Sequence, residues 1–383
     1  MTHLSLNRRH VLGGLGSAAF LPARLAYAAS APGDRRFVFI IQRGAADGLA
    51  TLAPVGDPAF ARARGALAED AAAALKLDAT FALHDAMGGT AALFAQKQAL
   101  FLHGVGIPYR DRSHFDAQNV LETGGSRPYE TGEGWMNRLL GLLPGGTRAM
   151  AVSATVPAAM RGPREVASYA NSRLPDANAE LLQRVSQLYA GDAQLHGLWE
   201  SAMQARMMAA GNDDNGQDPV ATGKLAASLL SGPQGARVAM IETGGWDTHF
   251  NQKGRLERQL KGLDAMIEAL RVGLGPAWND TLVLVATEFG RTVAPNGTGG
   301  TDHGTGSLAM LLGGTVNGGK VVADWPGLAQ GQLFEGRDLR PTLSLDAAIA
   351  GALGGHFGLD PARVLSGCFP GGDAKAIGGL IRA

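Results

Sequence analysis

Carboxylate and imidazole side chains gather in five short segments of this 383-residue chain. The segments are RGAADGL (43–49), YRDRSHFDAQ (109–118), TGGWDTHF (243–250), TEFGRT (287–292) and GTDHG (300–304). Their Gly, Asp and Ser residues are typical of loops. Carboxylate oxygens mixed with imidazole nitrogens suit a divalent metal ion of the zinc or manganese type. The five segments therefore predict a metal site, provided that the fold brings them together.

A serine and several arginines in the same segments extend the predicted chemistry to ester hydrolysis. Two metal ions a few ångströms apart can clamp a phosphoryl or sulfuryl group, one activating a serine and the other stabilising the leaving oxygen. Ser113 is the candidate nucleophile, and it would react through a covalent seryl intermediate. Bidentate contacts from Arg110, Arg112 or Arg291 would hold the remaining oxygens of the group.

Each of these residues also has a purely structural interpretation. Asp247 could cap a following helix, and Ser113 with Asp116 matches the S-x-x-D capping box. Glu288 and Arg291 could form a surface ion pair, which contributes little to stability. Because these interpretations require several independent coincidences, whereas one shared site explains the concentration, we favour the site.

Two further histidines and the single cysteine have weaker claims to a role. His84 and His103 either line the site or are structural histidines, and the structural interpretation is favoured for both. Cys368 is the one cysteine, so the chain has no intrachain disulfide. With no base partner suggested by the sequence, its thiol is predicted to be inert.

Strands of a parallel sheet that alternate with helices must position the five segments. Continuous apolar runs, typical of strands buried on both faces, occur at residues 37–42, 99–103, 149–152, 237–242, 281–286 and 307–312. Helical periodicity marks residues 251–272 and 177–208, and the polar stretch 211–218 is predicted to be an exposed loop. The alternation predicts an α/β fold with a mostly parallel open sheet flanked by helices on both faces.

Ligands of open α/β sheets bind beyond the carboxyl ends of the strands, where the loops converge. Four of the five segments follow a predicted strand, and GTDHG lies just before the run at 307–312. We therefore expect one small polar cavity at this edge. The residues expected to meet there are Asp47, Ser113, His249, Glu288 and His303.

The first 28 residues predict export. Arg8 and Arg9 precede a short apolar run that ends at Ala26-Tyr27-Ala28, the pattern of a twin-arginine signal peptide. Glycine, proline and arginine interrupt the run, which argues against a stable membrane span; an uncleaved anchor is the alternative. We expect the twin-arginine translocation machinery as a partner, a periplasmic or otherwise exported location, and a single α/β domain over residues 29–383.

Charge and motif patterns exclude other function classes. The 34 Lys and Arg residues equal the 34 Asp and Glu residues in number, so the formal net charge of zero does not favour nucleic-acid binding. The sequence contains no Walker A pattern and no G-x-S-x-G after a predicted strand. Nucleotide binding and an α/β-hydrolase triad are therefore poor fits.

Taken in order, FVFIIQRGAADGL, YRDRSHFDAQ, TGGWDTHFNQ, TEFGRT and GTDHG resemble the DUF1501 family of exported proteins. That family is placed in the alkaline phosphatase and sulfatase superfamily, and the resemblance covers nearly all of the chain after the signal. It implies an alkaline phosphatase-like fold and a divalent metal cofactor. By resemblance Asp47 follows the first strand, Ser113 is the nucleophile that opens a helix, Asp247 and His249 follow a later strand, and His303 is the final histidine.

The TEFG segment departs from the superfamily pattern. Asp-His usually follows this strand, whereas this chain has Glu288-Phe289, so one imidazole ligand is missing. Either Asp302 compensates, or GTDHG is itself the Asp-His motif in a shifted alignment, and a single metal or an altered pair remains open. The candidate metal ligands are Asp47, Asp247, His249, Glu288, Asp302 and His303, and the candidate catalytic residues are Ser113 and Arg291.

Two functions of different class are compatible with these patterns. The first is an exported, metal-dependent hydrolase that acts on a small-molecule phosphate or sulfate ester. The second is a catalytically degenerate periplasmic binding or envelope-organisation protein that retains the superfamily fold, and the missing Asp-His favours it. A sugar phosphate mutase of the cytoplasmic type fits the export signal poorly.

Overall fold

The computed structural model describes residues 34–170, 177–209, 218–371 and 374–382. The predicted signal segment, residues 1–28, lies outside the described residues, as does most of the polar stretch 211–218. Asp218, the last residue of that stretch, caps the helix that follows by accepting a hydrogen bond from the Ala221 N–H at 2.9 Å. Within the described ranges, no helix is both long and apolar enough to cross a bilayer.

A nine-stranded sheet forms the centre of the described part of the chain, in the order β11-β5-β10-β9-β1-β8-β6-β7, with β12 also paired to β5. Its strands are β1 (Arg36–Gln42), β5 (Ala99–Gly106), β6 (Ala149–Val152), β7 (Ala167–Ser168), β8 (Val238–Thr243), β9 (Thr281–Ala286), β10 (Ser307–Leu312), β11 (Lys320–Val322) and β12 (Leu343–Ser344). All neighbours pair in parallel except β10, which is antiparallel to both β5 and β9. The expectation of a mostly parallel sheet is confirmed.

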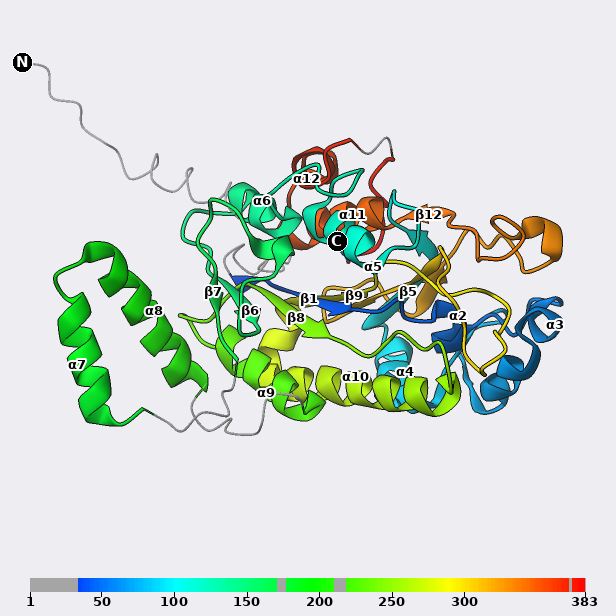
Figure 1. Cartoon of the computed structure of the whole chain (residues 1–383), viewed down its shortest axis with the longest axis horizontal. Helices are drawn as coiled ribbons and strands as arrows, with labels where there is room; N and C mark the ends of the chain where they lie inside the picture. The colour runs from blue at the N-terminus through cyan, green and yellow to red at the C-terminus, as the bar shows by residue number, and fades with distance from the viewer. Residues whose placement is uncertain (1–33, 171–176, 210–217, 372–373, 383) are drawn as a thin grey trace, which may run out of the picture.

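Helices cover both faces of the sheet, as expected (Figure 1). One face carries α5 (His114–Thr123), α6 (Trp135–Leu142), α11 (Leu345–Phe357) and α12 (Pro361–Cys368), and the other carries α4 (Gly88–Ala95), α9 (Pro219–Leu230) and α10 (Gln252–Leu274). The two cores follow the alternation of side chains along each strand. In β1, Phe37, Phe39 and Ile41 enter the first core, whereas Val38 and Ile40 enter the second.

Smaller elements surround this frame. A short sheet, β2 (Leu52–Ala53), β4 (Ala82–Leu83) and β3 (Leu75–Lys76), lies beside α2 (Gly48–Thr51) and α3 (Phe60–Arg64). The 3₁₀ helices are η2 (Gly65–Ala73), η3 (Asp85–Met87), η4 (Ala158–Met160), η5 (Gly275–Asp280) and η6 (Gln330–Gln332). The apolar patterns do not indicate the small sheet, because its strands are only two residues long.

The helix predicted over 177–208 is in fact two helices, α7 (Ala179–Tyr189) and α8 (Ala193–Ala209). Asp192 ends the single-helix pattern, because its Oδ1 accepts the N–H groups of Gln194 at 2.9 Å and Leu195 at 3.0 Å and so caps a new helix. The two helices form a hairpin that extends away from the sheet (Figure 1). Helical periodicity alone does not reveal the turn between them.

The orientation of β10 decides where the GTDHG segment lies. In a strand antiparallel to its neighbours, the amino end is at the carboxyl edge of the parallel strands. The residues just before β10 therefore lie at the same edge as the loops that follow β1, β5, β8 and β9. This edge carries all five segments.

Candidate metal centre

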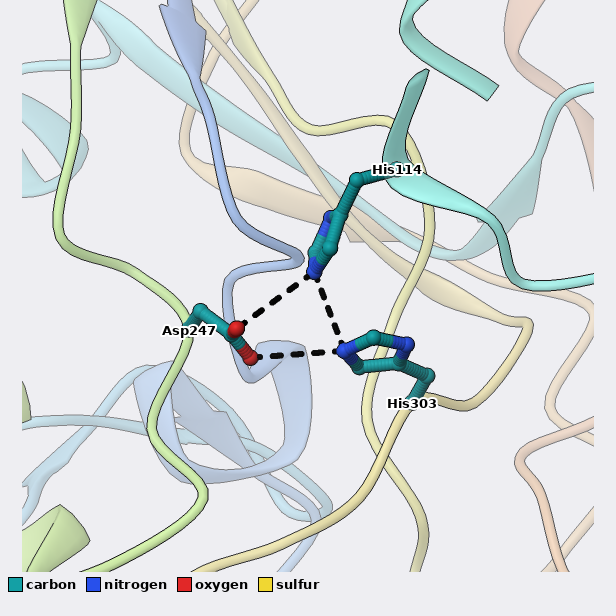
Figure 2. A group of neighbouring side chains, drawn as sticks. All are labelled: His114, Asp247 and His303. Atoms are coloured by element: carbon teal, nitrogen blue, oxygen red, sulfur yellow. Dashed lines mark hydrogen bonds and ion pairs between the residues drawn. The ribbon is translucent and has the colours of Figure 1, made fainter. Parts of the chain in front are cut away.

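Three side chains from three separate segments point at one another at the carboxyl edge (Figure 2). They are His114 at the start of α5, Asp247 after β8 and His303 before β10, and their potential ligand atoms all lie within 4.8 Å of one another. The two imidazole Nε2 atoms are 3.0 Å apart. Asp247 Oδ1 is 3.4 Å from His303 Nε2, and Asp247 Oδ2 is 3.6 Å from His114 Nε2.

Glycines let the surrounding loops approach closely. Gly44, in the loop after β1, has a φ of +114°, and a Cβ there would lie 2.7 Å from the Asp247 backbone nitrogen. A Cβ on Gly300 would lie 2.3 Å from the carbonyl carbon of His249. Both positions require glycine, because a side chain would push the neighbouring loops apart.

His249 is a fourth neighbour of this group. Its Nε2 lies 3.0 Å from His303 Nε2 and 3.0 Å from Asp247 Oδ1, and its side chain is 40 % exposed. Its Nδ1 lies 3.0 Å from Asp302 Oδ1. Asp302 thus orients the His249 ring. The hydrogen bond from Asn296 is the largest influence on the pKa of Asp302 and lowers it; burial raises the pKa by less, and the bond from His249 lowers it further.

Every histidine of the group has a hydrogen-bond acceptor at Nδ1. His114 Nδ1 lies 2.8 Å from Glu288 Oε1, and His303 Nδ1 lies 3.0 Å from the Arg112 carbonyl oxygen. A neutral imidazole carries one N–H, and these acceptors assign it to Nδ1. In their neutral forms, His114 and His303 therefore turn the lone pairs of their Nε2 atoms toward each other and toward the Asp247 carboxylate. Such lone pairs repel one another, and a bound cation removes that repulsion.

The donor set also fits a metal chemically. Neutral imidazole nitrogens and a carboxylate oxygen are the ligands of zinc and related divalent ions. Each Nδ1–H donates to a carboxylate or a backbone carbonyl, which is the usual outer support of metal-bound histidines. The residues present at this edge therefore fit a divalent ion held by His114, Asp247 and His303, with His249 beside them.

Glu288 lies behind His114, and its Oε1 is fully engaged. That oxygen accepts hydrogen bonds from His114 Nδ1 at 2.8 Å, Gln118 Nε2 at 2.9 Å and the Gly44 N–H at 2.9 Å. Burial raises the pKa of Glu288, but the bonds from His114 and Gln118 outweigh it and hold the pKa below its ordinary value. The bond to Glu288 in turn raises the pKa of His114. Glu288 was expected as a ligand, and the structure instead commits its Oε1 to hydrogen bonds within the protein, one of them with His114.

His114 is a member of this group that the sequence patterns did not single out. It stands next to Ser113 in YRDRSHFDAQ, and α5 brings its imidazole to within hydrogen-bond distance of Glu288 in the TEFG segment. The only signal in the sequence was its place inside one of the five segments, directly after the candidate nucleophile. Sequence spacing alone does not say which of the chain's histidines joins the group.

Arg291 is completely buried and lies behind Asp247. Its Nη1 donates to Asp247 Oδ1 at 2.5 Å, its Nε donates to Thr301 Oγ1 at 3.1 Å, and its Nη2 donates to the Thr301 carbonyl. Burial raises the pKa of Asp247, and Arg291 more than offsets this, so that the carboxyl is held in its charged form. The interpretation of Glu288 and Arg291 as a surface ion pair is wrong, because both are buried and each bonds a different partner.

Asp47 is not brought to the group. It caps α2 by accepting the Ala50 N–H at 3.0 Å, and its Oδ2 accepts from Arg64 Nη2 at 2.7 Å and Gln252 Nε2 at 2.6 Å. Both partners of the Asp47–Arg64 ion pair are about 1 % exposed. This environment is that of a buried structural carboxylate.

Ser113 occupies the N-cap position of α5, directly before His114. Its side chain makes no capping hydrogen bond, so the capping box expected with Asp116 is not formed. Asp116 instead accepts from the Tyr109 hydroxyl at 3.2 Å. The half-buried Ser113 hydroxyl is therefore not committed to closing the helix.

The remaining structural interpretations also have clear outcomes. Asp247 does not cap α10, whose N-cap residue is Asn251. His103 is buried between the Leu52 carbonyl, 2.9 Å from its Nε2, and the Gly104 N–H, and burial lowers its pKa to about 4. His84 Nδ1 accepts the Ala86 N–H at 3.1 Å. Both histidines have structural partners, as favoured.

Arg110 and Cys368 are the last two residues for which the sequence suggested a role or its absence. Arg110 lies in the same loop as Ser113, and its Nη1 donates to the carbonyl of its neighbour Tyr109 at 3.1 Å. Cys368 is buried, and burial raises its pKa to about 12. Its thiolate is scarce at neutral pH, in agreement with the predicted inertness.

Fold and site together define an α/β protein with a histidine-rich candidate metal centre at the carboxyl edge of its sheet. The chain belongs to the DUF1501 family, since the family model described as "Protein of unknown function (DUF1501)" matches residues 34–369. The expectation drawn from the five segments is thereby confirmed. No curated protein matches the chain.

Solved structures with a related main-chain arrangement include three hydrolases. A putative sulfatase from Bacteroides thetaiotaomicron VPI-5482 has 12 % identity and a TM-score of 0.40, over 90 % of this chain and 76 % of that one. A 2-O GAG sulfatase has 11 % identity and a TM-score of 0.35, over 85 % and 71 %. The phosphonate monoester hydrolase of Agrobacterium radiobacter has 11 % identity and a TM-score of 0.30, over 77 % and 72 %. At these values the likeness concerns the path of the main chain and not the chemistry.

Proposed function

We propose that this protein is an exported, metal-dependent hydrolase of phosphate or sulfate esters, with Ser113 as its nucleophile. One observation carries the proposal: the Nε2 atoms of His114, His249 and His303 converge with the Asp247 carboxylate, and His114 directly follows a serine that opens a helix. The ion is of the zinc or manganese type, held by His114, Asp247 and His303, with His249 adjacent. When bound, it supplies positive charge that polarises the ester and favours the ionised serine.

The position of Ser113 supports a nucleophilic role. Its hydroxyl lies at the N-terminus of α5, where the helix dipole and free backbone N–H groups favour a negative charge. Because the side chain makes no capping bond, it can turn toward a substrate without breaking the helix start. Its neighbour in the chain, His114, belongs to the metal group.

Two of the expected residues take supporting roles in this proposal. All three nitrogens of Arg291 are engaged by Asp247 and Thr301, so Arg291 orients the carboxylate ligand rather than holding the substrate. Asp47 stabilises the loop after β1 through Arg64. The proposed centre thus uses a different ligand set from the one expected, with His114 in place of Asp47 and Glu288.

Metal content and turnover, measured on the same preparations, test the proposal. We expect the wild type to contain a stoichiometric divalent ion and to hydrolyse p-nitrophenyl phosphate or p-nitrophenyl sulfate. Ser113→Ala should retain the ion and lose at least about 100-fold in kcat, since the nucleophile itself is removed. Ser366→Ala, on α12, is the matched control and should behave as the wild type.

The binding or envelope-organisation protein is the second candidate function. The observation in its favour is that Glu288 and Asp47, two of the expected ligand carboxylates, are committed to hydrogen bonds within the protein. It predicts a protein that binds the metal but turns over neither ester. Unchanged activity in Ser113→Ala would instead remove Ser113 from its role while leaving a hydrolase.

Export by the twin-arginine machinery is part of the same proposal. Arg8 and Arg9 are the arginine pair on which the proposed export signal depends. Replacing both with Lys should retain the full-length protein in the cytoplasm, and the wild type should be found in the exported fraction without its first 28 or so residues. N-terminal sequencing of the exported protein checks the cleavage site near Ala28.

A further inference from the structure

A tight turn far from the metal group in sequence reaches back to it in space. It consists of residues 334–338, in which Glu335 has a φ of +51° and Gly336 a φ of +65°. The turn is closed by the Phe334 N–H, which donates to the Asp338 carbonyl at 2.9 Å, and the Asp338 N–H, which donates to the Phe334 carbonyl at 3.0 Å. Asp338 is completely buried. None of the predicted site residues lies in this turn.

The carboxylate of Asp338 binds two arginines, one through each oxygen. Its Oδ2 accepts from Arg112 Nε at 2.9 Å and lies 2.8 Å from Arg112 Nη2. Its Oδ1 accepts from Arg337 Nε at 2.9 Å. Glu335 Oε2 adds a contact of 2.5 Å to Arg112 Nη2 at the exposed end of the guanidinium.

Both arginines hold His303, at different atoms. The Arg112 backbone carbonyl accepts the His303 Nδ1–H at 3.0 Å, and the Arg337 Nη2–H donates to the His303 backbone carbonyl. Asp338, Arg112, His303 and Arg337 thus form a closed ring of contacts. The ring fixes the side chain and the main chain of His303 at once.

The backbone of Arg112 needs such support. Its φ is +61°, a left-handed conformation that is unfavourable for a residue with a Cβ. In this conformation the Arg112 carbonyl oxygen lies 3.0 Å from His303 Nδ1. The ion pair with Asp338 anchors the side chain of Arg112 and thereby stabilises the strained carbonyl orientation.

We infer that Asp338 is a positioning residue for the metal centre, acting through Arg112 and Arg337 to hold the His303 imidazole with its Nε2 toward the other ligands. The inference rests on the proposed metal-dependent function and extends it to a residue that contacts no metal ligand side chain. It assigns a function to the turn at 334–338 and explains why a non-glycine residue keeps a positive φ beside the site.

Zinc affinity of the full-length protein, measured by competition with a chromophoric chelator, tests the inference. Asp338→Asn keeps the shape but loses the charge that holds the two guanidiniums, and we expect binding to weaken by about 10-fold. Asp264→Asn is the matched control: that carboxylate holds the start of α4 through the N–H groups of Gly89 and Thr90 on the other face of the sheet. It should leave zinc affinity unchanged.

A pair of variants at position 112 keeps the inference testable if Asp338→Asn fails to fold. Arg112→Gly and Arg112→Ala both lose the guanidinium, but glycine adopts a positive φ at no cost whereas alanine does not. Arg112→Ala should therefore bind zinc more weakly than Arg112→Gly. Equal affinities in these two variants would show that the strained carbonyl does not matter.

A second measurement does not depend on metal. Nitrogen chemical shifts of the His303 ring in the metal-free protein report whether the proton sits on Nδ1, and we expect the Nδ1–H form in the wild type and a mixture in Asp338→Asn. If the wild type binds no zinc, the proposed function fails, but the tautomer still decides the positioning role. A folded Asp338→Asn with wild-type affinity and wild-type tautomer would overturn the inference.

Discussion

The Nδ1–H of His114 donates to Oε1 of Glu288 over 2.8 Å, and this one bond joins the start of α5 to the end of β9. Glu288 is completely buried and accepts two further N–H groups from Gln118 and Gly44. The Thr287 hydroxyl donates to its other oxygen at 3.0 Å, and hydrogen bonds on both oxygens hold the buried carboxylate in place. The direction of the His114 ring, and with it the place of its Nε2, is therefore set by β9.

Replacing Glu288 should weaken metal binding without removing a ligand. In Glu288→Gln the charge is lost, and we expect metal affinity to fall by about 10- to 100-fold, the usual effect of removing the carboxylate behind a metal-bound histidine. Isothermal titration with zinc measures it. Glu268→Gln, on the exposed side of α10, serves as the control; equal affinities in the two variants would contradict the role of Glu288.

Metal binding should stabilise the folded protein. An ion at about 100 times its Kd adds about 2.7 kcal/mol to the free energy of unfolding if it binds only the folded state. Addition of zinc to chelator-treated protein should therefore raise the Tm, and His303→Ala should abolish most of the rise. A Tm that does not respond to zinc in the wild type would argue against a metal at this edge.

Asp47 should be important for stability and not for metal content. Removing its charge leaves the buried Arg64 guanidinium without its partner, which typically costs about 3–5 kcal/mol. Asp47→Asn should accordingly lower the denaturant midpoint by a large amount, while any folded fraction keeps its metal. Loss of metal from folded Asp47→Asn would restore Asp47 as a ligand.

His103 should make stability depend on pH in the acid range. Burial lowers its folded pKa from 6.5 to about 4, partly offset by the Leu52 carbonyl and the charge of Asp47. The folded state keeps His103 neutral, so below pH 6.5 the unfolded chain binds the additional proton. The contribution is therefore complete above pH 6.5 and is lost as the pH falls toward 4, by about 3 kcal/mol in all.

Comparison with His103→Gln isolates this effect, since other groups titrate in both proteins. Glutamine keeps an N–H donor for the Leu52 carbonyl but carries no titrating ring. Urea unfolding at several pH values should give a steeper loss of stability in the wild type between pH 6.5 and 4. Parallel curves for the two proteins would exclude His103 as the cause.

The sequence predicted the strands well, because a strand buried on both faces must be apolar throughout. The runs at 149–152, 281–286 and 307–312 coincide with β6, β9 and β10, and the long helix expected at 251–272 is α10, Gln252–Leu274. The periodicity over 177–208 concealed the turn at Asp192, since capping by a single side chain leaves the apolar spacing unchanged. The pattern of apolar residues therefore identifies helices and strands better than it identifies the residues at which they end.

The sequence by itself determined that carboxylates and imidazoles follow the strands of an α/β sheet, and that the chain carries the motifs of its family. Only the tertiary structure decided which of them meet. The antiparallel placement of β10 brings His303 to the others. The partners Arg64, Arg291 and His114 determine the separate environments of Asp47, Asp247 and Glu288. The physical reason is that a polar side chain's role depends on which donors and acceptors reach it once water is excluded, and those come from segments far away in the chain.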